Sequence, residues 1–179
     1  MSAVVNQDEM VPRLETERLR LRGHRPEDFE NCVALWSNED VLRYVGGKVM
    51  TREEVWARLL RYVGHWMWMG YGYWAVEEKA TGNFVGEVGY AMHKRQMEPA
   101  LGDCPELGWV LAPRFHGRGY ATEAARTAMQ WGEQQFRGQE TVCIIAPENG
   151  KSIRVAEKCG FRELARTTYK GEPTILFVH

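Results

Sequence analysis

WVLAPRFHGRGYATEAA, residues 109–125, is the stretch of sequence that decides the fold. It begins as a strand that ends at Ala112-Pro113, continues as a tight basic turn, and becomes a helix with alanines at helical spacing. Gly117 and Gly119 permit positive φ and let backbone N–H groups approach a ligand, while the following helix directs its positive dipole end to the same point. Arg114 and Arg118 add positive charge, so we predict a phosphate or pyrophosphate site.

Two familiar phosphate motifs do not fit this turn. The third glycine of the dinucleotide fingerprint and the Gly-Lys-Ser/Thr of the P-loop are both missing. Residues 114–119 instead fit Arg/Gln-x-x-Gly-x-Gly/Ala, and residues 149–161, NGKSIRVAEKCGF, fit Asn-x-x-Ser/Ala-x-x-Val/Leu-x-x-Lys-x-Gly-Phe. Together these motifs resemble the GCN5-related N-acetyltransferases (GNAT), and the continuation YATEA is similar to the branch that acetylates ribosomal-protein amino termini. The resemblance covers roughly residues 13 to 178.

The resemblance implies a single-domain α/β fold that binds acetyl-CoA. Its mixed, mostly antiparallel sheet would have about seven strands with flanking helices. The strands before and after the phosphate helix would splay apart, and the pantetheine arm would lie in the gap. The coenzyme contacts implied in this way are Trp109, Val110, Leu111, Arg114, Gly117, Arg118, Gly119, Tyr120, Ala121, Thr122, Asn149 and Ser152.

Length and composition restrict the class of protein. The 179 residues suit one domain, which we place at 13–179 after a flexible tail at 1–12. Because 23 basic residues balance 24 acidic ones, we expect no nucleic-acid partner. We expect a cytoplasmic protein without a signal peptide or membrane span. The scattered cysteines and histidines lack metal-ligand spacing, so we predict no metal. GNAT relatives often pair, which makes a homodimer possible.

Periodicity and turn residues predict the elements of the chain. Alternation in 18–22 predicts a strand, Pro26 opens a helix, and Thr51-Arg-Glu-Glu54 is a capping box for a second helix that ends at Gly70. The apolar run 141–146 predicts a central strand. Strands are expected at 18–22, 73–77, 84–90, 105–111, 141–146, 162–169 and 174–178, and helices at 26–38, 51–69, 119–136 and 149–160.

Acetyl transfer to an amine needs a neutral amine, a held carbonyl and a stabilised thiolate. Glu106, on the strand leading into the phosphate turn, is our first candidate for the base, acting directly or through water. The alternative is a strand-end carboxylate paired with an arginine. Glu87 is the second candidate, with packing or a contact to the substrate ammonium as alternatives. His116 lies in the phosphate turn, which argues against catalysis.

The oxyanion and the leaving group need hydrogen-bond donors. A backbone N–H around Val110 would meet the oxyanion. Many GNAT members place a tyrosine after the Val/Leu of the second motif to protonate the thiolate, but Ala156 stands there. The resemblance makes Ser152 the substitute, although it can equally be a first-turn helix residue. Asn149 is expected to cap that helix and to contact the coenzyme or substrate.

We therefore predict an acetyl-CoA-dependent N-acetyltransferase that works through a ternary complex. Its acceptor is a protein amino terminus or a small-molecule amine, and the sequence does not choose between them. The alternative is a non-catalytic coenzyme A-binding sensor or interaction module of the same fold, and the missing tyrosine at Ala156 is its support.

Overall fold

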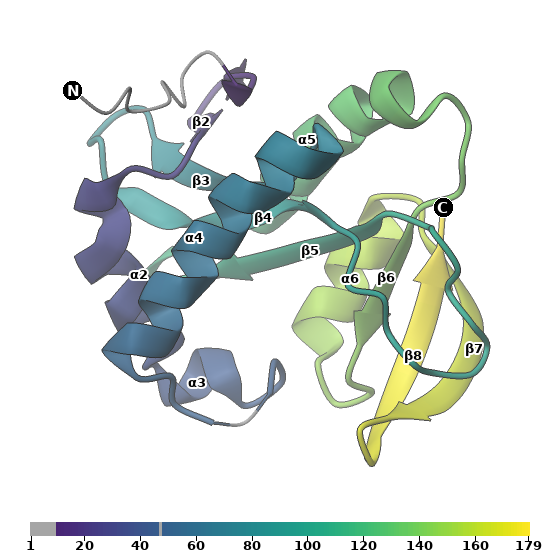
Figure 1. Cartoon of the computed structure of the whole chain (residues 1–179). Coiled ribbons are helices and arrows are strands. Elements are labelled where there is room, and N and C mark those ends of the chain that lie inside the picture. Colours follow the sequence, from purple (N-terminus) through teal and green to yellow (C-terminus); the bar gives the residue numbers. More distant parts are fainter. Residues whose placement is uncertain (1–9, 47) are drawn as a thin grey trace.

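The computed structural model describes residues 10–46 and 48–179. Within them, eight strands form one sheet (Figure 1). The strands are β1 Leu14–Glu15, β2 Leu19–Arg22, β3 Tyr73–Glu78, β4 Phe84–Ala91, β5 Glu106–Leu111, β6 Val142–Ile145, β7 Arg162–Tyr169 and β8 Glu172–Val178. The helices are η1 Pro26–Asp28, α2 Phe29–Trp36, α3 Glu39–Leu42, α4 Arg52–Met69, η2 Pro113–Phe115, α5 Tyr120–Phe136 and α6 Gly150–Lys158. Residues 1–9 of the predicted tail lie outside the described residues. None of the described helices is long and apolar enough to cross a membrane.

The sheet separates two hydrophobic clusters. Successive strand residues point to opposite faces, so Ala75 packs with α2 and α4 while Val76 packs with α5. The α5 side is the larger cluster and also contains Ala156 of α6. The predicted α/β class is therefore confirmed, with helices on both faces of one mixed sheet.

The strand order is β1-β2-β3-β4-β5-β6-β8-β7. Neighbours are antiparallel except for β5 and β6, which are parallel and share a single register pair, Glu106 with Val142. Among the described residues, the rest of β5 therefore has a partner strand only on its β4 side. The predicted gap between the strands that flank α5 is present.

Helix ends follow the local sequence signals. The Thr51 hydroxyl accepts from the Glu54 N–H (3.2 Å), and the Glu54 carboxylate accepts from the Thr51 N–H (2.7 Å), so the capping box forms as predicted. Gly70 ends α4 with φ 70°. The sequence did not predict β1 and α3, because elements of two and four residues are too short to show a periodicity.

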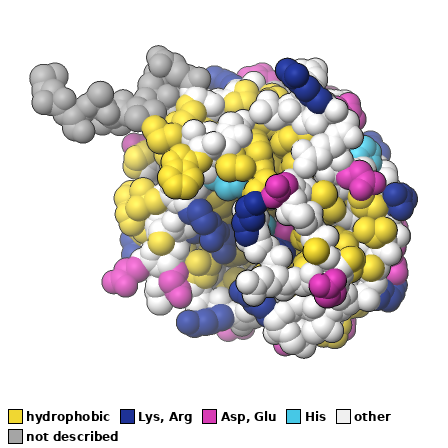
Figure 2. Space-filling model, turned by 45° about the vertical axis from the view of Figure 1, so that its right-hand side comes forward, with side chains coloured by type: hydrophobic (Ala, Val, Ile, Leu, Met, Phe, Trp, Pro, Cys, Tyr) yellow, Lys and Arg dark blue, Asp and Glu magenta, His cyan; other side chains and the backbone are white. Residues whose placement is uncertain are grey.

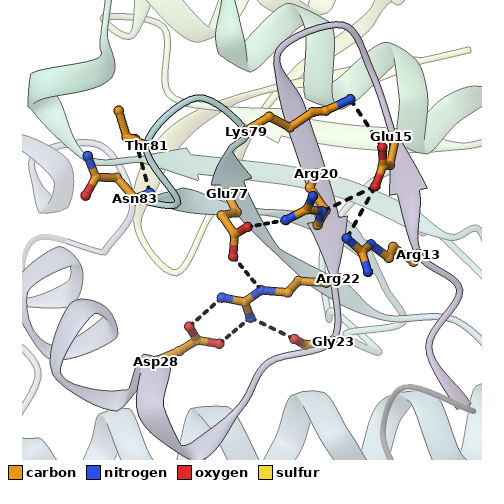
Figure 3. Close-up of polar contacts among 10 residues, drawn as sticks. All are labelled: Arg13, Glu15, Arg20, Arg22, Gly23, Asp28, Glu77, Lys79, Thr81 and Asn83. Carbon is orange, nitrogen blue, oxygen red and sulfur yellow. Dashed lines mark hydrogen bonds and ion pairs between the residues drawn. The ribbon is translucent and has the colours of Figure 1, made fainter.

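The polar face of β2 differs from a solvated strand face (Figure 3). Arg22 is buried, and its guanidinium donates to both oxygens of Asp28 at 2.7 and 2.8 Å and to Glu77 at 3.0 Å. Arg20 donates to the other oxygen of Glu77. The Asp28 hydrogen bonds raise the pKa of Arg22 although burial opposes them. Acids from β3 and η1 thus cover this face with paired charges.

Candidate active site

The phosphate turn has the backbone conformation that its glycines predict. Gly117 and Gly119 have φ values of 77° and 80°, and Gly119 is the N-cap of α5. The first N–H groups of a helix have no intrahelical acceptor, so those of Tyr120, Ala121 and Thr122 are available to an anion. The turn and the start of α5 together present backbone donors at one point.

Two basic side chains flank the turn. The guanidinium groups of Arg114 and Arg118 lie 4.9 and 5.3 Å from the centre of the Phe115 ring. Arg114 precedes Phe115 in the sequence and Arg118 follows it. Arg118 is half exposed, and its guanidinium lies 3.5 Å from the Glu78 carboxylate. Arg114 donates a long hydrogen bond of 3.4 Å to the Phe84 carbonyl. Neither contact is tight, so both charges can turn toward a bound phosphate.

Arg18, just before β2, fastens the turn to the sheet. Its Nη1 donates to the Arg118 carbonyl at 3.0 Å, its Nε donates to Glu123 at 2.8 Å, and its guanidinium lies 4.6 Å from the Tyr120 ring. Burial raises the pKa of Glu123, but hydrogen bonds from Thr16 and Arg18 outweigh burial and leave it lowered. The sequence could not reveal this clamp, because its partners lie about a hundred residues apart.

The unpaired edge of β5 offers backbone groups to the gap. The Ala112 N–H donates to the Val85 carbonyl on the β4 side (2.9 Å). Because donors alternate along a strand, the Val110 N–H points the same way, and those of Trp109 and Leu111 point into the gap. The Leu111 carbonyl is 2.8 Å from His116 Nε2. His116 thus interacts with the last carbonyl of this edge. A structural role of this kind agrees with the argument against a catalytic histidine.

Glu106 lies where β5 meets β6. Arg95 donates two hydrogen bonds to its carboxylate, of 2.6 and 2.7 Å. This is the ion pair with an arginine that we gave as the alternative to a catalytic role. His93 Nε2 is 3.9 Å from the same carboxylate. Burial lowers the pKa of His93 to about 4. The negative charge of Glu106 acts in the opposite direction, and the positive charge of Arg95 lowers the pKa further. A neutral imidazole therefore lies beside Glu106, a neighbour that no pattern in the sequence indicates.

Glu87 lies on the same sheet face but is fully buried. Its Oε2 accepts from the Tyr62 hydroxyl (2.8 Å) and the Trp36 indole (3.1 Å). Its Oε1 accepts from the Cys32 thiol (3.5 Å) and is 3.5 Å from His24 Nε2. Burial raises the pKa of Glu87, but His24, the Tyr62 hydroxyl and the Arg58 charge leave it lowered. The contacts favour the packing alternative over contact with a substrate.

His24, Cys32 and Glu87 are also the described group whose metal-ligating atoms lie within 4.8 Å of one another. Both Glu87 oxygens already accept hydrogen bonds, and burial raises the pKa of the Cys32 thiol. A protonated thiol is a poor metal ligand. The prediction of no metal stays a prediction.

The second motif forms α6 on the other side of the gap. The Asn149 Oδ1 accepts from the Ser152 N–H at 3.1 Å, so Asn149 is the predicted N-cap. Gly160 has φ 86°, and the Phe161 N–H donates to the Ala156 carbonyl at 3.0 Å, which closes the helix as expected. Ala156 is fully buried. Ser152, in the first turn of the helix, is partly exposed.

An open-edged strand that leads into an anion-binding turn and helix is the arrangement of a coenzyme A-dependent acyltransferase. Figure 2 shows a mixed-charge face, with acidic and basic side chains next to one another at its centre and hydrophobic side chains around them. Residues 18–162 match the family model of the GNAT acetyltransferase domain. The chain therefore belongs to the GNAT acetyltransferase family, whose members are acetyl-CoA-dependent acyltransferases.

Known proteins resemble the chain over most of its length. The uncharacterised protein YkkB of Bacillus subtilis (strain 168) is 34% identical over 152 residues, which are 83% of this chain and 84% of YkkB. The solved structure of a GNAT-family acetyltransferase from Bordetella pertussis has a TM-score of 0.84 at 27% identity, covering 94% of this chain and 99% of that one. RimL, solved with coenzyme A, shares the fold at 14% identity and a TM-score of 0.76, covering 94% of this chain and 97% of RimL.

Proposed function

We propose that the protein transfers the acetyl group of acetyl-CoA directly to a primary amine within a ternary complex. The observation that carries this proposal is the unpaired edge of β5 that leads into the phosphate turn. Such an edge can pair with an extended amide-containing chain, and the turn can hold a pyrophosphate at the end of that chain. Acetyl-CoA combines these two chemical features.

The residues around the gap fit this coenzyme. The N–H groups of residues 119–122, with Arg114 and Arg118, would hold the pyrophosphate. The N–H groups of Trp109 and Leu111 would pair with the pantetheine arm, and Val110 packs behind them against the α4 side. Asn149 and Ser152 would approach from α6 across the gap. Bound in this way, acetyl-CoA supplies a thioester as the acyl donor.

The reaction needs a proton acceptor for the amine. We propose Glu106, acting directly or through a water, with the neutral His93 beside it as a second acceptor. The amine nitrogen bonds to the carbonyl carbon, and the C–S bond then breaks. A backbone N–H of β5 near Val110 would stabilise the oxyanion, and the Ser152 hydroxyl would donate to the sulfur. Glu87 would have a structural role on this face, because it accepts hydrogen bonds from Tyr62 and Trp36.

The acceptor is a protein amino terminus or a small amine. An α-amino group has a reference pKa of about 8, so part of it is neutral at cellular pH, whereas a lysine near 10.4 depends more on a base. RimL is named an alpha-N-protein acetyltransferase, which makes free-amino-terminus peptides one class to test. We further propose a cytoplasmic location and leave a homodimer open to measurement.

The test is mass-spectrometric detection of acetylated product. The protein is incubated with acetyl-CoA and either free-amino-terminus peptides or small amines, in parallel with the Gly119→Val variant. Product in one set from the wild type alone identifies the acceptor class. Tight acetyl-CoA binding without product in either set would contradict the enzymatic proposal for these acceptors and favour a non-catalytic coenzyme A sensor.

A further inference from the structure

One cross-strand row of the sheet contains a tyrosine and two glycines. Tyr73 on β3 pairs with Gly89 on β4, and Gly89 pairs with Gly108 on β5. A Cβ atom at Gly89 would meet the backbone of Gly72 and Tyr73 at the start of β3, so glycine there lets β3 and β4 approach closely. Glycine at position 108 leaves room on β5, the strand that borders the gap, for the end of the Tyr73 side chain.

The Tyr73 hydroxyl ends directly over Gly108. A Cβ atom added at Gly108 would lie 2.1 Å from the hydroxyl oxygen and 3.2 Å from the ring carbon that carries it. Gly108 is two residues from Glu106 and adjacent to Trp109, on the edge proposed to hold the pantetheine arm. The hydroxyl of a distant strand thus occupies the place of a β5 side chain, next to the gap.

Packing fixes the Tyr73 ring in this position. It stacks on the Tyr62 ring, with centroids 4.9 Å apart and 21° between planes. The Tyr62 hydroxyl is held in turn by Glu87 at 2.8 Å. The Trp66 indole donates to the Tyr73 carbonyl at 3.0 Å. Glu87 therefore fixes the Tyr62 ring, and Tyr62 fixes the Tyr73 ring by stacking on it.

The surroundings keep the Tyr73 phenol protonated. Burial raises its pKa, and the charges of Glu106 on β5 and Glu87 on β4 raise it further. Arg58 on α4 and Arg95 in the β4–β5 loop oppose the increase without cancelling it. At neutral pH this hydroxyl is a hydrogen-bond donor rather than a base. Within the part of the chain that the structure describes, no residue accepts a hydrogen bond from it.

We propose that the Tyr73 hydroxyl donates a hydrogen bond to the thioester sulfur as acetyl transfer proceeds. The inference rests on the proposed function and supplies a donor that Ala156 cannot. When the C–S bond breaks, its electron pair stays on sulfur, and Tyr73 stabilises this thiolate while keeping its own proton. The proton lost by the amine leaves through Glu106, and solvent protonates the released thiolate.

The experiment measures stabilisation of the thiolate without turnover. Affinities of coenzyme A and desulfo-coenzyme A are compared by calorimetry from about pH 6.5 to about pH 9.5, which brackets the ordinary thiol pKa of about 8.5. The wild type should prefer coenzyme A increasingly as pH rises, by about tenfold, as a hydrogen bond to a charged group implies. Tyr73→Phe should lose most of this preference but bind desulfo-coenzyme A as the wild type does. Its kcat should fall by about a hundredfold, the effect of removing one donor to a developing charge.

The control is Tyr71→Phe, because Tyr71 is a neighbouring tyrosine that packs on the α5 side of the sheet. It should keep the full pH-dependent preference. Gly108→Ala, whose methyl group would displace the hydroxyl, should behave like Tyr73→Phe if its thermal unfolding shows a folded protein. Unchanged preference in Tyr73→Phe, or its loss only in Ser152→Ala, would overturn the assignment. Failure of every variant and the wild type to bind desulfo-coenzyme A would instead refute the proposed function.

Discussion

The buried carboxylate of Glu87 provides the sharpest test of the difference between a structural and a catalytic acid. In Glu87→Gln, one amide oxygen can still accept from Tyr62 and Trp36, but both hydrogen bonds become neutral. A hydrogen bond to a charged group contributes about 1.5–3 kcal/mol to stability, and a neutral one about 0.5–1.5 kcal/mol. Each of the two hydrogen bonds should therefore contribute about 1 kcal/mol less in the variant. We expect the free energy of unfolding to fall by about 2 kcal/mol.

Glu87→Ala should be more damaging, because it leaves the Tyr62 hydroxyl and the Trp36 indole buried without an acceptor. Each unsatisfied donor costs about 1–3 kcal/mol, and the cavity adds to this, so about 4–5 kcal/mol should be lost. Urea unfolding followed by tryptophan fluorescence measures both variants. An unchanged slope of free energy against urea concentration would show that the difference lies in the folded state.

The pH dependence gives this prediction its sign. The pKa of Glu87 is lower in the folded chain than its ordinary value, so its contribution is fully present above that ordinary value, about 4.3. The contribution is lost as pH falls through the lower folded-state pKa. The stability difference between wild type and Glu87→Gln should therefore narrow below about pH 4.3. Equal stability at neutral pH combined with a large fall in kcat would refute the structural interpretation and make Glu87 a reacting group.

Three further predictions test the remaining parts of the site. Gly119→Val should abolish coenzyme A binding in calorimetry, because the side chain blocks backbone approach at φ 80°; Gly138→Val, at φ 84° beyond the other end of α5, should leave affinity intact. Glu106→Gln should slow turnover, most strongly at low pH, with coenzyme affinity unchanged; a wild-type rate at every pH would remove Glu106 from the mechanism. Asn149→Ala should lower the free energy of unfolding by about 1 kcal/mol and Tm by about 2–4 °C, whereas Asn149→Asp should retain most of both; equal melting curves for all three proteins would mean that the N-cap adds nothing.

Local signals in the sequence predicted the elements around the gap well. The capping box at Thr51, the N-cap at Asn149 and the positive-φ glycines of the phosphate turn depend on residues within a few positions of one another, so their chemistry is visible in the chain. The family motifs added the gap between β5 and β6, which no periodicity could show. The proposed coenzyme site rests on these features.

The environment of the acids could not be predicted in the same way. Glu87 receives its donors from α2 and α4, and these meet it only when the helices pack on the sheet. Arg95 reaches Glu106 from an irregular loop. The row of Tyr73, Gly89 and Gly108 depends on the register of three strands, whereas the sequence shows only a tyrosine and two glycines. Each of these contacts depends on tertiary structure rather than on local propensity.

The single register pair between β5 and β6 also bears on how the molecule holds together. Strands β1–β5 and β6–β8 meet in the sheet at one rung, and residues of α5, α6 and the β4–β5 loop pack across this junction. If coenzyme A pairs along the open edge as proposed, it would complete the sheet there, and folding would be thermodynamically linked to coenzyme supply. At about a hundred times the dissociation constant, such a ligand adds about 2.7 kcal/mol to stability. The lifetime of the protein in a cell would then follow the acetyl-CoA and coenzyme A that are available to it.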